Sequence, residues 1–232
     1  MMTEFLYLTD SYLFETTARV VQQTADYLIL DKTIFYPQGG GQPCDQGSIT
    51  AYGVEIFINL VRMVDEEVHH YGEITGPIPE HVTCRIDKNR RILNAKHHTA
   101  GHLLAGCLEC AHPQLTATKC HAFPNEAYVE FKGAVDLQPQ SIQELVNQSI
   151  KQEIQTKVFE IDLASFENKY YRLPYTVPSN KPFQVLQIGD YKPVPCGGTH
   201  LSNTSEIGSI LIKKVKTKDG VLKVSYEVCE SR

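Results

Sequence analysis

The sequence has no tryptophan, only three methionines, and no apolar run long enough to cross a bilayer. Its first ten residues also lack the cationic region and apolar core of a secretory signal. Otherwise the composition is ordinary, with 42% hydrophobic and 21% charged residues. These features argue against a secreted, membrane, fibrous or disordered protein. We expect a cytoplasmic globular protein with room for one large domain or two modest ones.

The cysteine count and the charge exclude further classes. Seven cysteines are an odd number and no secretory signal precedes them, so we expect reduced thiols, some buried and some available as metal ligands. The net charge of −5 is not that of a protein that coats nucleic acid non-specifically. Two basic groups depart from this balance: Lys88, Arg90 and Arg91, and Lys213, Lys214, Lys216, Lys218 and Lys223. From charge alone, we expect both groups of basic residues to be ordinary solvent-exposed surface rather than binding sites.

Residues 1–88 are expected to form a small β-barrel. Short apolar or alternating runs separated by turn residues occur at Phe5–Leu8, Ala18–Gln22, Tyr27–Leu30, Val54–Asn59 and Val82–Ile86. The segment 33–43 interrupts them with Gly39, Gly40 and Gly41, which can adopt positive φ and let another chain come close. A flexible hairpin is the alternative, but the flanking prolines and aromatic residues favour a shaped, functional loop.

A helical period replaces the β pattern near residue 88. Asp87 can cap a helix over Arg90–Cys110, on which His98 and His102 share one face. Ile92, Leu93, Ala100, Leu103, Leu104 and Cys107 occupy the opposite, apolar face. Cys107 lies on that face and Cys110 at its edge. We therefore expect both to be core thiols rather than a metal or redox pair.

Residues 89–232 are expected to form an α/β two-layer domain with an antiparallel sheet, so the whole chain is α+β. After a loop with Cys120 and His121 we expect a strand at Ala127–Lys132 and an amphipathic helix from Pro139 whose apolar positions run to Ile154. Further strands are expected at Val158–Leu163, Val185–Ile188, Ser209–Lys216 and Val221–Val228. Asp219 and Gly220 turn the last pair.

A metal site is the strongest functional prediction. His98 and His102 are four residues apart on a helix, and Cys196 and His200 are four apart in a loop with two glycines. Each pair alone is a weak signal, but together they supply three imidazoles and one thiol, a donor set that suits Zn²⁺. Thr99 follows His98 where a zincin protease needs glutamate, so that class is excluded. Whether the ion is structural or catalytic, and whether His200 always ligates it, stays open.

Four stretches resemble the editing domain of alanyl-tRNA synthetase: His98–Leu104, Cys196–His200, the glycine motif Phe35–Gly47 and the tail Val221–Tyr226. Gln38 and Cys44 depart from the usual residues of the glycine motif. The chain leaves no room for an aminoacylation domain, and so resembles the free-standing AlaX editing proteins of medium length with an N-terminal barrel.

The resemblance implies hydrolysis of mischarged tRNA(Ala), carrying serine or glycine, with Zn²⁺ held by His98, His102, Cys196 and His200. Thr33 would recognise the serine hydroxyl, with Gln42 and His121 as further catalytic candidates. Gly39, Gly40, Gly41 and Thr199 would bind the substrate, and the basic groups would hold the acceptor end. Two rival functions remain: a binding module with a structural zinc, and a metallohydrolase of small esters. The oligomeric state is not predicted.

Overall fold

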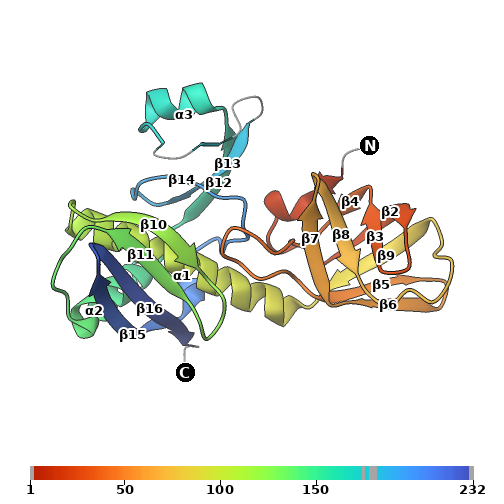
Figure 1. Cartoon of the computed structure of the whole chain (residues 1–232), viewed down its shortest axis with the longest axis horizontal. Helices are drawn as coiled ribbons and strands as arrows, with labels where there is room; N and C mark the ends of the chain where they lie inside the picture. Colours follow the sequence, from red (N-terminus) through yellow and green to blue (C-terminus); the bar gives the residue numbers. More distant parts are fainter. Residues whose placement is uncertain (1–2, 174–175, 178–181, 230–232) are drawn as a thin grey trace. The chain divides into compact units, whose positions relative to one another are not determined.

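The computed structural model describes residues 3–173, 176–177 and 182–229 and is α+β, with mainly antiparallel sheets. Contacts divide the chain into two compact units, Met1–Ala95 and Lys96–Arg232. The division falls inside the long helix α1 (Lys88–Ala111), coloured yellow-green in Figure 1. The α+β class is thus confirmed, while the predicted domains 1–88 and 89–232 stay a prediction.

The first unit contains a seven-stranded sheet in the order β6-β5-β9-β2-β3-β8-β7. Its strands are β2 (Glu15–Gln23), β3 (Tyr27–Leu30), β5 (Gly47–Ala51), β6 (Val54–Ile58), β7 (Leu60–Val64), β8 (Glu67–Tyr71) and β9 (His81–Ile86). A short parallel pair, β1 (Glu4–Phe5) with β4 (Lys32–Thr33), and a 3-10 turn at Leu6–Leu8 accompany it.

Within the described residues this sheet is open, so the predicted closed barrel is not confirmed. Strand β2 pairs with β9 through its first half and with β3 from Val20 onward, and a bulge at Val20/Gln22 interrupts the pairing with β3. The bulge bends the sheet. Only Asn59 separates β6 from β7, so the two edge strands are consecutive in the chain. The two edge strands of the bent sheet therefore meet at Asn59, but among the described residues no backbone hydrogen-bond pairing between β6 and β7 closes the sheet into a barrel.

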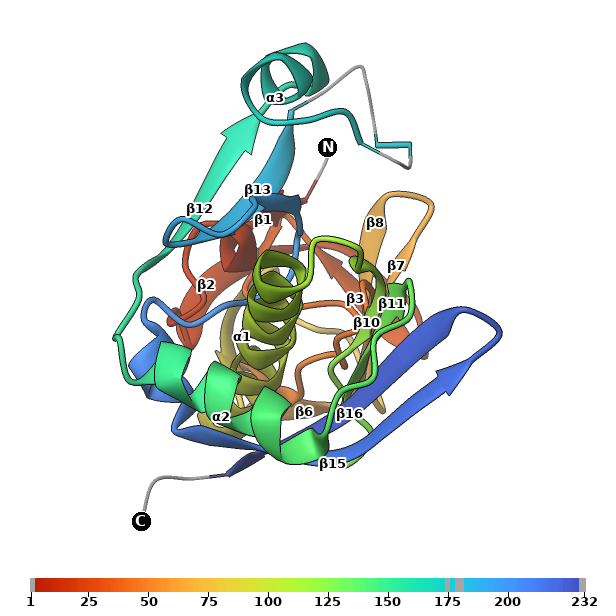
Figure 2. The same ribbon diagram turned by 90° about the vertical axis from the view of Figure 1, so that its left-hand side faces the viewer.

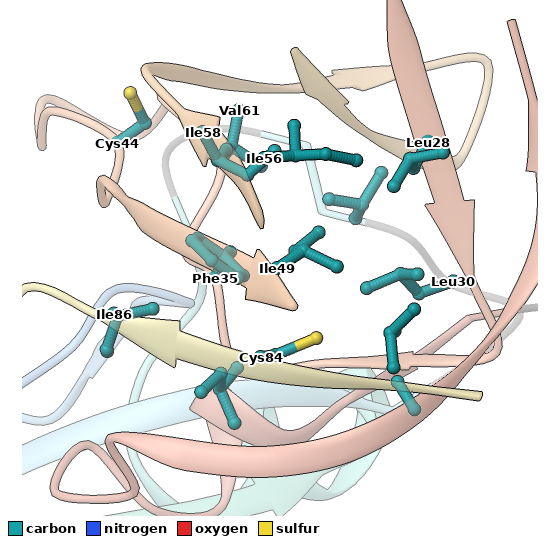
Figure 3. Close-up of a cluster of buried hydrophobic side chains, with 14 residues drawn as sticks. Leu28, Leu30, Phe35, Cys44, Ile49, Ile56, Ile58, Val61, Cys84 and Ile86 are labelled. Carbon is teal, nitrogen blue, oxygen red and sulfur yellow. The ribbon is translucent and has the colours of Figure 1, made fainter. Parts of the chain in front are cut away.

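The core of the first unit lies inside this curled sheet. Figure 3 shows Leu28, Leu30, Ile49, Ile56 and other labelled side chains gathered between the strands. All of these are buried, and Leu28, Leu30 and Ile56 belong to the predicted apolar runs. Phe35 from the glycine motif joins the same cluster. The motif is thereby anchored to the core at its start.

The second unit is built on the sheet β10-β11-β16-β15. Its strands are β10 (Thr116–His121), β11 (Tyr128–Lys132), β15 (Ser209–Lys218) and β16 (Val221–Cys229). Helix α2 (Pro139–Ile150) lies along β15 (Figure 2). Asn147 hydrogen-bonds the backbone of Ile210, and Gln143 accepts from the backbone N–H of Ile212. A smaller sheet consists of β12 (Thr156–Ile161), β13 (Phe183–Ile188) and β14 (Val194–Pro195), with α3 (Leu163–Lys169) after β12 and a 3-10 turn at Thr204–Ile207.

Two expectations for this unit are wrong. The segment predicted as a loop around Cys120 and His121 is strand β10, and α2 ends at Ile150, so Ile154 lies beyond it. Helix α3 was not predicted. Its N-cap is Asp162, whose carboxylate accepts a hydrogen bond from the Ser165 backbone N–H.

The expected helix at Arg90–Cys110 is confirmed as α1, and Asp87 caps it by accepting from the Arg90 backbone N–H at 3.0 Å. Leu93 and Cys110 are exposed, against the prediction that both face the core. Arg91 is fully buried, so it does not contribute to a basic surface. None of the helices in the described part of the chain has both the length and the apolar composition that crossing a membrane requires.

Candidate metal centre

The four predicted metal ligands come together in the second unit. One possible ligand atom from each of His98, His102, Cys196 and His200 lies within 4.8 Å of the other three. The first two are one turn apart on α1, so their rings project from one face of the helix. The other two follow β14, in a loop with Gly197 and Gly198 between them.

Two hydrogen bonds donated by backbone N–H groups position the loop, one to β13 and one to a side chain of the helix. The Cys196 N–H donates to the Gln184 carbonyl at 2.9 Å, which continues the pairing of β13 with β14. At the other end, the Leu201 N–H donates to Thr99 Oγ1 at 3.0 Å. Thr99 is the residue that excluded the protease class, and here it holds the loop next to His98. The two halves of the site are thus fastened independently of any ion.

The spacing of the donor atoms fits one tetrahedral zinc ion. Bonds of about 2.0–2.1 Å to nitrogen and 2.3 Å to sulfur would separate tetrahedral donors by roughly 3.3–3.6 Å. The Nε2 atoms of His98 and His102 are 3.2 Å apart. Cys196 Sγ lies 3.5 Å from His98 Nε2 and 3.4 Å from His200 Nε2. These three spacings match a tetrahedral ion and the other donor pairs lie within 4.8 Å, so the residues present fit the metal that the sequence predicts.

Burial sets the protonation of these groups. It lowers the pKa of His102 to about 4. Burial, and then the neighbouring imidazoles, holds the pKa of His98 and His200 well below the ordinary value. Burial raises the pKa of the Cys196 thiol to about 11. The imidazoles are therefore neutral at pH 7, as ligands must be, and the thiol needs a cation nearby before it loses its proton.

A cavity of about 260 Å³ opens beside the cluster, and His102 forms part of its wall. The other walls come from α1, β10, β13, β14, the segment that carries Tyr191 and Lys192, and the single residues Val129 of β11 and Tyr171. Within the cluster His98 and His200 are buried, whereas His102 and Cys196 are partly exposed. A small substrate can thus reach the donor cluster from the His102 side.

Gly101 and Tyr226 shape this part of the site, and no role was predicted for either. A Cβ on Gly101 would lie 2.6 Å from Cys120 Sγ and 2.7 Å from the Tyr226 hydroxyl oxygen. That hydroxyl donates to the His97 carbonyl at 2.7 Å. Glycine between the two histidines lets the ligand-bearing helix approach β10 and β16. A glycine within a helix was the available signal, since it usually marks close packing.

Thr33 lies in the first unit and its hydroxyl is already engaged. Its Oγ1 accepts from the Phe35 N–H at 3.0 Å and lies 2.8 Å from His70 Nε2. His70 Nδ1 lies 3.1 Å from the Leu28 carbonyl, which can only accept. His70 therefore carries its proton on Nδ1, and the Thr33 hydroxyl donates to Nε2. One lone pair of Thr33 remains, so Thr33 could only accept from a substrate hydroxyl.

The glycine loop has a defined, hydrogen-bonded conformation. The Gln42 N–H donates to the Gly39 carbonyl at 2.9 Å, and the Gly39 N–H donates back to Gln42 at 3.2 Å. Between them Gly40 and Gly41 have φ of +54° and +79°, the conformation of a tight turn that glycine tolerates best. The Tyr36 hydroxyl also donates to the Gly39 carbonyl at 2.9 Å. Gln42 is buried in this turn.

A buried ion pair holds the end of the glycine motif. Arg91 on α1 donates to both carboxylate oxygens of Asp45 and to the carbonyls of Ser11 and Ile34. Asp45 in turn accepts from the Tyr36 N–H at 2.7 Å. Sequence reasoning placed Arg91 on a basic surface, because its partner is 46 positions earlier and no local pattern joins them. The roles predicted for Thr33, Gln42 and the three glycines stay predictions.

The two remaining candidates lie in the second unit. Thr199 is buried in the Cys196–His200 loop. His121 ends β10, where its ring stacks on Phe123 with centroids 4.4 Å apart and packs against Tyr128. It is not one of the four clustered residues, and the cavity lining on β10 ends at Cys120. Its catalytic role therefore stays a prediction without a contact to the cluster.

Comparisons with known proteins match both units. A family model of class II (A) tRNA synthetases matches residues 3–90. A model of the second additional domain of threonyl and alanyl tRNA synthetases matches residues 184–223, the segment with Cys196 and His200.

Curated relatives match nearly the whole chain. The alanyl-tRNA editing protein AlaX-L of Pyrococcus horikoshii is 32% identical over 225 residues, which cover 94% of this chain and 55% of that protein. Alanine–tRNA ligases of Ignicoccus hospitalis and Thermococcus kodakarensis are 32% and 31% identical, over 97% and 99% of this chain and 26% of each ligase. The chain thus spans about a quarter to about half of these relatives.

Proposed function

Because the chain belongs to the family of alanyl-tRNA editing proteins and editing regions of alanyl-tRNA synthetases, we propose that it is a hydrolase that deacylates mischarged tRNA(Ala) in trans. The preferred substrate is Ser-tRNA(Ala), with Gly-tRNA(Ala) also accepted, and the reaction takes place in the cytoplasm without ATP. The observation that carries the proposal is the cluster of three imidazoles and one thiol beside an open cavity.

The reaction is the hydrolysis of an ester, and each part of the site has a task. His98, His102, Cys196 and His200 would hold Zn²⁺, which when bound supplies a Lewis acid beside the ester carbonyl. None of these four side chains is a carboxylate, so the site has no general base among its ligands. The cavity beside His102 orients the aminoacyl group, and its walls limit the access of bulk water.

Selectivity requires a group that distinguishes serine from alanine, because a synthetase pocket rejects an added hydroxyl only weakly. Thr33 is the proposed reader, and its remaining lone pair would accept a hydrogen bond from the serine hydroxyl. Gln42 and the turn at 39–41 are proposed to bind the aminoacyl end, with Thr199 beside the metal ligands. His121 is a weaker candidate.

The test is a substrate panel with purified protein: Ser-tRNA(Ala), Gly-tRNA(Ala), Ala-tRNA(Ala) and the free methyl ester of serine. We expect turnover of the first, slower turnover of the second, and little of the third and fourth. Serine that stays attached at stoichiometric enzyme would show that the protein is a binding module with a structural zinc. Equal rates on the free ester and on charged tRNA would point to a small-ester hydrolase.

A further inference from the structure

One face of the β10-β11-β16-β15 sheet is lined by lysines. Alternate residues on β11 and β16 are buried on the side of the helices: Val129, Phe131, Leu222 and Val224. The residues between them point the other way, and the strand register carries this side across all four strands. We call it the lysine face; it consists of Lys119, Lys132, Lys214, Lys216, Lys218 and Lys223.

The face concentrates positive charge in a chain whose net charge is −5. Five of its six lysines are exposed and Lys223 is half-buried. Glu130 and Glu227 are the acidic residues in the same register. Glu227 is paired with Lys213 at 2.9 Å, outside the set of six, and Glu130 is paired with Lys223 of the face at 3.3 Å, so the positive excess comes from the other five lysines. An excess of this kind on one sheet face attracts a polyanion.

The lysines form rows rather than a scatter. Lys214, Lys216 and Lys218 alternate along β15, so they are spaced about 6.8 Å apart on one side of the strand. Across the sheet, Tyr128 supports two more ammonium groups: Lys223 Nζ lies 3.2 Å from its ring centroid and Lys119 Nζ 5.6 Å. In Figure 1 the blue hairpin β15-β16 lies beside the green strands β10 and β11. The face thus offers several phosphate-binding points on a rigid element.

The lysine face adjoins the cavity through strand β10. Strand β10 is an edge of the sheet, and its residues Thr116–Cys120 form one wall of the cavity that His102 also lines. Lys119 belongs to both the wall and the face. Lys192 lines the same cavity, with its ammonium 3.9 Å from the ring centroid of Tyr171. A polyanion that lies on the face can therefore have its end in the cavity beside the metal ligands.

We propose that the lysine face binds the phosphate backbone of the RNA whose aminoacylated end enters the cavity. This rests on the proposed function for the identity of the RNA, but the binding itself does not require hydrolysis. Phosphate contacts of this kind position a nucleic acid without reading its sequence. They also explain how an acidic protein can hold a tRNA, because the local field at the face is positive.

The experiment measures binding of uncharged tRNA(Ala) by fluorescence anisotropy over a range of salt concentrations. The variant Lys214→Gln/Lys216→Gln/Lys218→Gln removes three charges from exposed positions on β15. Its matched control, Lys151→Gln/Lys157→Gln/Lys169→Gln, removes three from exposed positions elsewhere in the second unit. We expect the first variant to bind roughly 10-fold or more weakly near 0.1 M salt, with the slope of log K against log salt reduced by about 2–3. The control should keep the wild-type slope.

Equal losses in the two variants, or none in either, would overturn the proposal. Tighter binding of the wild-type protein to vesicles of acidic phospholipid than to tRNA, lost in the β15 variant, would assign the face to a membrane and also overturn it. Because the tRNA is uncharged, a protein that fails to deacylate but shows the expected loss would refute the proposed function and leave this inference standing.

Discussion

Replacing Arg91 by methionine should destabilise the protein severely. The Arg91 and Asp45 side chains are both 0% exposed, and Arg91 also donates to two backbone carbonyls. Methionine roughly keeps the length of the side chain, but it leaves the Asp45 carboxylate buried without its counter-charge. Removing one partner of a buried ion pair typically costs about 3–5 kcal/mol. At about 2–4 °C per kcal/mol for a chain of this size, the melting temperature should fall by about 6–20 °C.

The assay is thermal unfolding followed by circular dichroism, with Arg85→Met as the matched control. Arg85 pairs with Glu15 at 2.7 Å, but the two side chains are 59% and 55% exposed, so solvent screens the pair and its removal should change the melting temperature little. The double variant Arg91→Met/Asp45→Leu removes the stranded charge and should recover part of the loss. An Arg91→Met protein that melts within 1–2 °C of Arg85→Met would refute this reasoning.

Three further predictions concern single groups. Gly101→Ala should cost about 1–3 kcal/mol of unfolding free energy and weaken zinc binding in a competition titration, because its Cβ has no room, whereas Gly76→Ala, in open space, should change neither. Gly41→Ala places a side chain at φ +79° and should cost about 1–2 kcal/mol in chemical denaturation, while Gly39→Ala should cost less. Burial lowers the pKa of His70 to about 4. As the pH falls from 6.5 to 4, His70 therefore takes up a proton in the unfolded chain but stays neutral in the folded chain. His70 alone should lower the stability by up to about 3 kcal/mol over that window, and His70→Gln should remove that part of the pH dependence.

The sequence predicted elements whose signals are long or chemically specific. Helix α1 spans more than six turns, so its period was clear, and the donor types at His98 and Cys196 indicated one soft metal site although they lie far apart in the chain. The four ligands could be named because each pair lies four residues apart on a local element.

The missed features depend on partners that are distant in the sequence. The residues of β10 alternate poorly, and the strand is held by pairing with β11 and by Glu109, which accepts from the Ala117 N–H at 2.7 Å. Burial of Arg91 depends on a carboxylate from another part of the chain. The lysine face appears only once the register of β15 and β16 is known, because charge alone favoured an ordinary exposed hairpin.

The central claim is that His98, His102, Cys196 and His200 form one zinc site that supports deacylation. The most direct measurement determines bound zinc and the rate of serine release from Ser-tRNA(Ala) on the same preparations of wild type, Cys196→Ala and the control Cys110→Ala. We predict about one zinc per chain and serine release for wild type and Cys110→Ala, and loss of both for Cys196→Ala. A Cys196→Ala protein that keeps its zinc and its full rate would contradict the account.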